Sequence, residues 1–116
     1  MPVQRDYILR LLEQAAAVVR RLRELLTRKG APPADIVEEA RAAQAELFGD
    51  TWALLQRVDA TTATGLIRDT RQLALWADLL RIEAAANRQL GDEQRAQDLE
   101  ARAVRIAEAA PPPNAR

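Results

Sequence analysis

The sequence of 116 residues contains no histidine, no cysteine and no serine. Without these residues the chain cannot build a serine–histidine–aspartate triad, a thiol nucleophile, a disulfide or a histidine–cysteine metal centre. Glycine is also scarce, with four residues, and none of them belongs to a glycine-rich loop of the kind that cradles phosphates. The sequence therefore predicts a protein that is not an enzyme and that uses no cofactor and no metal.

An excess of charge of one sign is lacking as well, because 17 basic residues balance 17 acidic ones. Residues 1–30 hold seven cations and three anions, whereas residues 31–50 hold one cation and five anions. A basic cluster near residue 30 could grip nucleic-acid phosphates or an anionic membrane surface. Its members are Arg20, Arg21, Arg23, Arg28 and Lys29. The neutral total and the acidic segment that follows favour internal pairing instead, so we expect no nucleic-acid and no membrane partner.

No long hydrophobic run is present. The apolar stretch over residues 8–19 is interrupted by Arg10, Glu13 and Gln14, which makes it neither a signal-peptide core nor a segment long enough to span a bilayer. We therefore expect a cytoplasmic protein.

What the sequence does contain is helical periodicity, with apolar residues at alternating steps of three and four. The first set is Ile8, Leu12, Ala15, Val19, Leu22 and Leu26, and the last set is Ala96, Leu99, Ala103, Ile106 and Ala110. Strand-like alternation does not persist beyond a few residues. The pattern predicts an all-α fold, an antiparallel bundle of about five to six helices, in a single domain over residues 1–110 with a disordered tail over residues 111–116.

Proline, glycine and capping residues predict where the helices end. The first helix is expected to start near Pro2 and to run to about Lys29, with Gly30 as its left-handed terminus. Asp59 and Asp92 are expected to be N-caps of later helices. The further predicted helices span residues 34–48, 51–58, 60–68, 70–90 and 93–110.

The opening residues 6–14, Asp-Tyr-Ile-Leu-Arg-Leu-Leu-Glu-Gln, resemble the first helix of a bacterial family of small helical proteins known only as a domain of unknown function. In that family the chain closes with a hairpin similar to a tetratricopeptide unit, which would correspond here to residues 73–110. Its small-residue positions are matched by Ala84, Gly91, Ala96 and Ala103. Asn87 and Glu100 stand where such a unit usually has aromatic residues. The resemblance implies a fold and carries over no reaction.

The carboxylates are the remaining candidates for chemistry. Neighbouring acids such as Glu38 with Glu39 point to different faces of a helix, so we interpret them as helix-start charges rather than metal ligands. Glu83 is the best candidate for a buried acid because apolar residues surround it in sequence, yet a glutamate on the helix surface is the expectation. Asp98 and Arg102, four residues apart, predict an ion pair on the last helix.

The favoured hypothesis is a noncatalytic module that binds a protein or peptide in the groove between the closing hairpin and the neighbouring helices. The predicted partner-binding residues are Trp52, Trp76, Leu80 and Asn87. Trp76 is spaced to lie in the core, whereas Trp52 is expected to be half exposed. The alternative is a self-associating, homodimeric protein that pairs its first helix along residues 8–26. A carboxylate enzyme or ligand binder with an interhelical pocket is a third hypothesis.

Overall fold

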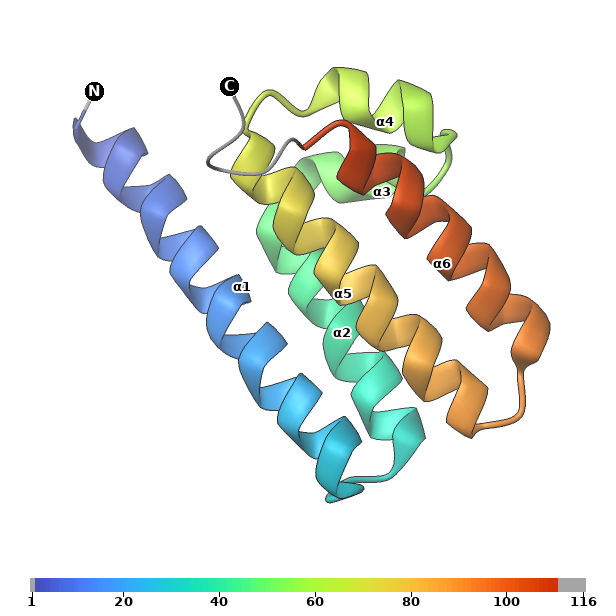
Figure 1. The fold of residues 1–116 in the computed structure, drawn as a ribbon. Coiled ribbons are helices and arrows are strands. Elements are labelled where there is room, and N and C mark those ends of the chain that lie inside the picture. Colours follow the sequence, from blue (N-terminus) through green and yellow to red (C-terminus); the bar gives the residue numbers. More distant parts are fainter. Residues whose placement is uncertain (1, 111–116) are drawn as a thin grey trace.

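The computed structural model describes residues 2–110, and every regular element in that range is helical (Figure 1). The elements are α1 (Pro2–Arg28), α2 (Pro33–Phe48), the 3-10 turn η1 (Gly49–Thr51), α3 (Trp52–Leu55), α4 (Ala60–Leu66), α5 (Thr70–Gln89) and α6 (Glu93–Glu108). The predicted all-α fold class is confirmed. The tail predicted at residues 111–116 lies outside the described residues. Between residues 2 and 110, no helix combines the length and the apolar character required to cross a membrane.

Helix α5 lies at the centre of the bundle. It runs antiparallel to α2 on one side and to α6 on the other, and α1 packs against both α2 and α5 (Figure 1). The short helices α3 and α4 lie together at one end, where α4 contacts α6 and α3 contacts α2. Helix α5 is therefore covered on two sides, and α5 and α6 form an antiparallel helical hairpin over the residues where the resemblance implied one.

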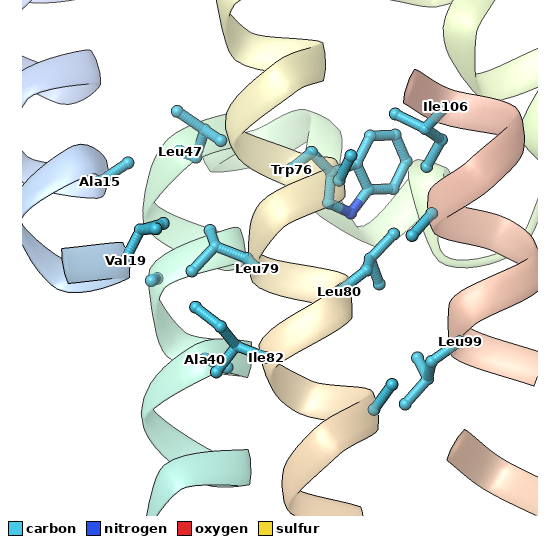
Figure 2. Close-up of a cluster of buried hydrophobic side chains, with 14 of the residues drawn as sticks. Ala15, Val19, Ala40, Leu47, Trp76, Leu79, Leu80, Ile82, Leu99 and Ile106 are labelled. Atoms are coloured by element: carbon cyan, nitrogen blue, oxygen red, sulfur yellow. The ribbon is translucent and has the colours of Figure 1, made fainter. Parts of the chain in front are cut away.

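The core follows from this central position, because α5 carries buried side chains on both of its packed faces. Figure 2 shows Leu79 and Ile82 directed towards α1 and α2, whereas Trp76 and Leu80 are directed towards α6. The buried α6 residues are those of the predicted repeat, Ala96, Leu99, Ala103 and Ile106. The small residues Ala84, Ala96 and Ala103 are fully buried, which lets the α5 and α6 axes approach closely.

The end of α1 differs from the prediction in one respect. The residue with left-handed backbone geometry is Lys29, at φ 52°, and not Gly30. The Gly30 N–H donates to the Leu25 carbonyl at 3.0 Å, as in a Schellman motif, in which the left-handed residue precedes the one that closes the helix. A methyl group on Gly30 would lie 3.3 Å from the Leu25 side chain. Gly30 therefore provides space, and Lys29 makes the turn.

The predicted caps of the later helices are confirmed. Asp59 accepts a hydrogen bond from the Thr62 N–H, and Asp92 accepts one from the Arg95 N–H. Asp69 caps α5 in the same manner. In the middle of the chain the first short helix is a 3-10 turn followed by one α-helical turn, so α3 ends at Leu55, three residues before the predicted boundary.

The apolar face of α1 packs against other helices of the same chain. Leu12, Ala15, Val19 and Leu22 are buried. The apolar residues of α1 beside them are half-buried, namely Leu11, Val18 and Leu25. The residues predicted to pair two copies of the first helix thus lie mostly inside the bundle. Among the large apolar side chains of α1 over residues 5–28, Tyr7 and Leu9 are the exposed ones.

Candidate functional site

A groove of about 220 Å³ opens between α2, α5 and α6, with α3 at one end. We call it the tryptophan groove. It is lined by Arg41, Gln44, Trp52, Gln56, Trp76, Leu80, Glu83, Arg95, Asp98, Leu99 and Arg102. Residues far apart in sequence meet here because α2 and α6 pack on neighbouring sides of α5, and α3 follows α2 after one short turn.

Three aromatic rings cluster at one end of the groove, where Trp52 and Trp76 line it and Phe48 packs behind them. Phe48 stacks on Trp52 with ring centroids 6.2 Å apart, and the Trp76 ring meets Trp52 edge-on at 6.1 Å. Phe48 and Trp76 also meet edge-on, at 4.9 Å. Phe48 and Trp76 are buried, whereas Trp52 is only partly buried. Two core rings therefore hold Trp52 in place at the edge of the groove.

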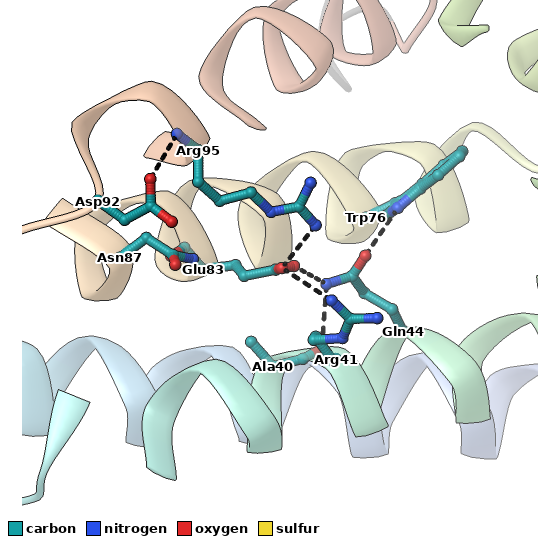
Figure 3. Close-up of polar contacts among 8 residues, drawn as sticks. All are labelled: Ala40, Arg41, Gln44, Trp76, Glu83, Asn87, Asp92 and Arg95. Carbon is teal, nitrogen blue, oxygen red and sulfur yellow. Dashed lines mark hydrogen bonds and ion pairs between the residues drawn. The ribbon is translucent and has the colours of Figure 1, made fainter. Parts of the chain in front are cut away.

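A chain of buried polar groups runs along the groove floor. Gln44 accepts a hydrogen bond from the Trp76 indole N–H at 3.1 Å and donates through Nε2 to Glu83 Oε1 at 2.9 Å (Figure 3). Its Nε2 also approaches the Ala40 carbonyl at 3.2 Å. Gln44 is 1% exposed and Glu83 is 3% exposed, so the amide satisfies an indole and a carboxylate that are both removed from water.

The expectation of a surface glutamate at position 83 was wrong. Helix α5 is covered on two sides, so a glutamate on the same face as its apolar residues is buried with them. Burial of a carboxylate requires partners, and Glu83 has Gln44 on Oε1 and the guanidinium groups of Arg41 and Arg95 near Oε2, at 3.9 and 3.6 Å. Figure 3 shows these two arginines reaching the carboxylate from α2 and α6.

Arg102 also departs from the expected pattern. Its guanidinium donates to the carbonyls of Leu55 and Val58, at 2.7 and 3.1 Å, and lies 5.3 Å from the centroid of Trp76. Burial lowers the pKa of Arg102, and the negative charge of Asp59 opposes this effect. Arg102 thus ties α6 to α3 and stacks on the aromatic cluster. The predicted ion pair with Asp98 is absent from the described residues, because the arginine is engaged with these backbone carbonyls.

The structure brings together three of the four predicted partner-binding residues. Trp52, Trp76 and Leu80 line the groove, and Trp76 and Leu80 belong to the buried core. Trp76 is in the core and Trp52 is partly exposed, as expected. Asn87 is not among the lining residues. It is buried farther along α5, where its side chain donates to the Glu83 carbonyl at 2.9 Å.

Sequence reasoning missed Arg41, Gln44 and Arg95. Gln44 had a detectable signal, because it lies four residues after Ala40 and three before Leu47, in a row that is otherwise apolar and buried. The two arginines had none, since an exposed arginine on a helix is common and their meeting depends on how α2 and α6 pack.

The basic cluster of α1 is partly neutralised by acids of the same chain. Arg21 pairs with Glu39 of α2 at 3.0 Å, and Arg23 pairs with Asp78 of α5 at 3.1 Å. The first of these ion pairs joins the basic segment over residues 1–30 to the acidic segment over residues 31–50, for which the charge pattern predicted internal pairing.

The groove offers few chemically reactive side chains. Its lining residues provide two carboxylates, three guanidinium groups and two indoles, with no hydroxyl, thiol or imidazole. Among residues 2–110, no three acidic side chains are grouped so that they could hold a metal ion.

Comparisons of the chain with protein-family models, curated proteins and solved structures found no match. The resemblance to small tetratricopeptide-like proteins of bacteria stays a prediction. The geometry of the tryptophan groove is therefore the basis for any functional conclusion.

Proposed function

We propose that this chain is a cytoplasmic, noncatalytic helical module that binds a segment of another protein in the tryptophan groove. The observation that carries the proposal is Trp52, a large aromatic side chain held at the groove edge by two buried rings. Tryptophan dominates interface hot spots because it offers a large contact area with few rotatable bonds. A side chain already fixed in position loses little entropy on binding.

The size of the groove supports a protein partner over a free small molecule. Pockets for small molecules usually enclose about 300 to 1,000 Å³, whereas this groove holds about 220 Å³. That space suits one or two side chains of a longer segment, with the rest of the segment lying across the rim. The absence of a hydroxyl, thiol or imidazole among the lining residues supports binding without catalysis.

The proposal is tested with a displayed library of random short peptides, selected on the purified full-length protein. Affinities of the selected peptides are then measured by fluorescence anisotropy. Trp52→Ala is expected to weaken binding by about 30-fold or more, the loss typical of a hot-spot residue. Tyr7→Ala is the matched control, because Tyr7 is an exposed aromatic outside the groove.

Circular dichroism of each variant establishes that it is folded before its affinity is compared. Selected peptides that bind Trp52→Ala as tightly as the parent protein would contradict the proposal, as would a selection that yields no binder.

Self-association is the second candidate function. The surface that favours it lies at the start of α1 and differs from the row over residues 8–26 that the sequence predicted. Tyr7 is 57% exposed and Leu9 is also exposed. A shallow hollow is lined by Tyr7 together with residues that include Leu11 and Glu46, whereas Leu9 is not among its lining residues. A dimer seam there would involve the start of α1 and not the buried row. Sedimentation of the parent protein and of Tyr7→Ser at high concentration distinguishes a dimer through this surface from a monomer.

A further inference from the structure

Two arginines from different helices meet at the end of the tryptophan groove away from Trp52. Arg41 comes from α2 and Arg95 from α6, and both approach Oε2 of the buried Glu83 (Figure 3). Because they approach the same oxygen atom, the two guanidinium groups lie close together. Their side chains are 49% and 47% exposed, so the pair also faces solvent at the groove.

Glu83 occupies these arginines only in part. The separations of 3.9 and 3.6 Å are longer than the 2.7 to 2.9 Å of a charge-assisted hydrogen bond. The other carboxylate oxygen is engaged by Gln44. Each guanidinium has five N–H donors, and two positive charges share one negative charge. This end of the groove therefore has both the donors and the charge to bind a second carboxylate.

The side chains that line the groove carry a net positive charge even when its other charged residues are included. Arg102 donates to two neutral backbone carbonyls, so those contacts do not cancel its charge. Asp98 is the second acid of the lining and accepts a hydrogen bond from Gln94, which lies outside the groove. With three guanidinium groups against two carboxylates, the groove attracts an acidic occupant.

We propose that the tryptophan groove selects acidic segments of a partner protein, in which Arg41 and Arg95 bridge an aspartate or glutamate side chain and Trp52 packs against an adjacent apolar side chain. This inference rests on the proposed function and adds the chemistry of the partner. The arginine pair and the aromatic end belong to one groove, so one short segment can engage both.

The test uses two synthetic peptides with blocked ends, one with two glutamates beside two leucines and the other with glutamines in place of the glutamates. Their affinities for the full-length protein are measured by fluorescence anisotropy. The glutamate peptide is expected to bind about ten-fold more tightly, because charge-assisted hydrogen bonds replace neutral ones. In Arg41→Gln/Arg95→Gln this preference is expected to fall to about two-fold or less.

The charge-matched control is Arg20→Gln/Arg68→Gln, which removes the same two charges from exposed positions outside the groove. It is expected to keep the preference. Glu83→Gln removes the carboxylate that competes for Arg41 and Arg95, so it is expected to tighten binding of the glutamate peptide. If the arginine double variant is not folded, the single variants Arg41→Gln and Arg95→Gln are used, and each is expected to reduce the preference.

Equal affinity for the two peptides, or a preference that survives loss of the arginines, overturns the inference. If Trp52-dependent peptides without acidic residues are selected, the inference fails while the proposed function stands. If no peptide binds through Trp52, both fail. Competition by free glutarate as effective as that by the glutamate peptide indicates a small-anion site and also overturns the inference.

Discussion

Replacement of Gln44 by leucine tests whether the buried polar chain is essential to the fold. Gln44→Leu leaves the Trp76 indole N–H without its acceptor and Glu83 Oε1 without its donor. A buried neutral group without a partner costs about 1 to 3 kcal/mol, and a hydrogen bond to a charged group contributes about 1.5 to 3 kcal/mol. The leucine recovers about 1 kcal/mol through apolar burial. The free energy of unfolding should therefore fall by about 1.5 to 5 kcal/mol.

The measurement is urea unfolding followed by circular dichroism and tryptophan fluorescence. The matched control is Gln94→Leu, the same substitution at an exposed glutamine that donates to Asp98 at 3.0 Å. Its effect should stay within about 0.5 kcal/mol, because solvent replaces the lost bond. A loss below about 1 kcal/mol for Gln44→Leu would refute the reasoning.

A second substitution identifies the source of the cost. Gln44→Leu/Glu83→Leu removes the carboxylate that the first change leaves with a vacant oxygen. Replacing both partners of a buried polar pair by apolar groups is far less costly than removing one. The double variant should therefore be more stable than Gln44→Leu alone. A double variant that is less stable would show that the penalty does not come from the carboxylate.

Two further predictions concern helix ends. Lys29→Gly should raise the free energy of unfolding by about 0.5 to 1 kcal/mol, because glycine adopts the left-handed geometry without strain. The control Arg28→Gly changes the preceding, helical residue and should lower the free energy of unfolding. The opposite order of the two variants in urea unfolding would contradict this account. The hydrogen bond from the Arg71 side chain holds the pKa of Asp69 below its usual 3.8, so the acid stabilises the fold above about pH 4 and loses this contribution as the pH falls through the depressed value. Asp69→Asn should flatten the dependence of the free energy of unfolding on pH below about pH 4, and an unchanged pH dependence in urea unfolding would exclude this contribution.

The helices and their ends could be predicted from sequence because their signals are local. Periodic apolar residues fixed the buried faces of α1 and α6, and Asp59 and Asp92 cap helices because an aspartate accepts from a nearby N–H. Lys29 was missed because lysine rarely takes positive φ, so glycine was the natural choice.

The aromatic and apolar part of the candidate site was predicted from the sequence, whereas its charged part was not. The helical spacing of Trp76 predicted its burial, and Leu80, which was predicted as a partner-binding residue, is buried in the same helix. The arginine pair could not be found, because Arg41 and Arg95 are 54 positions apart and meet only through packing. Glu83 was wrongly expected on the helix surface, because the partners on other helices that make its burial tolerable cannot be read from the sequence.

The polar chain on the groove floor connects the core to the proposed binding surface. Gln44 fixes Trp76, Trp76 supports Trp52, and the same Gln44 holds the carboxylate that Arg41 and Arg95 approach. Both ends of the groove are thus positioned by one buried side chain. A rigid site loses less entropy when a partner binds. A purely apolar groove floor could give the fold the same stability, but it would not hold the two arginines at one point.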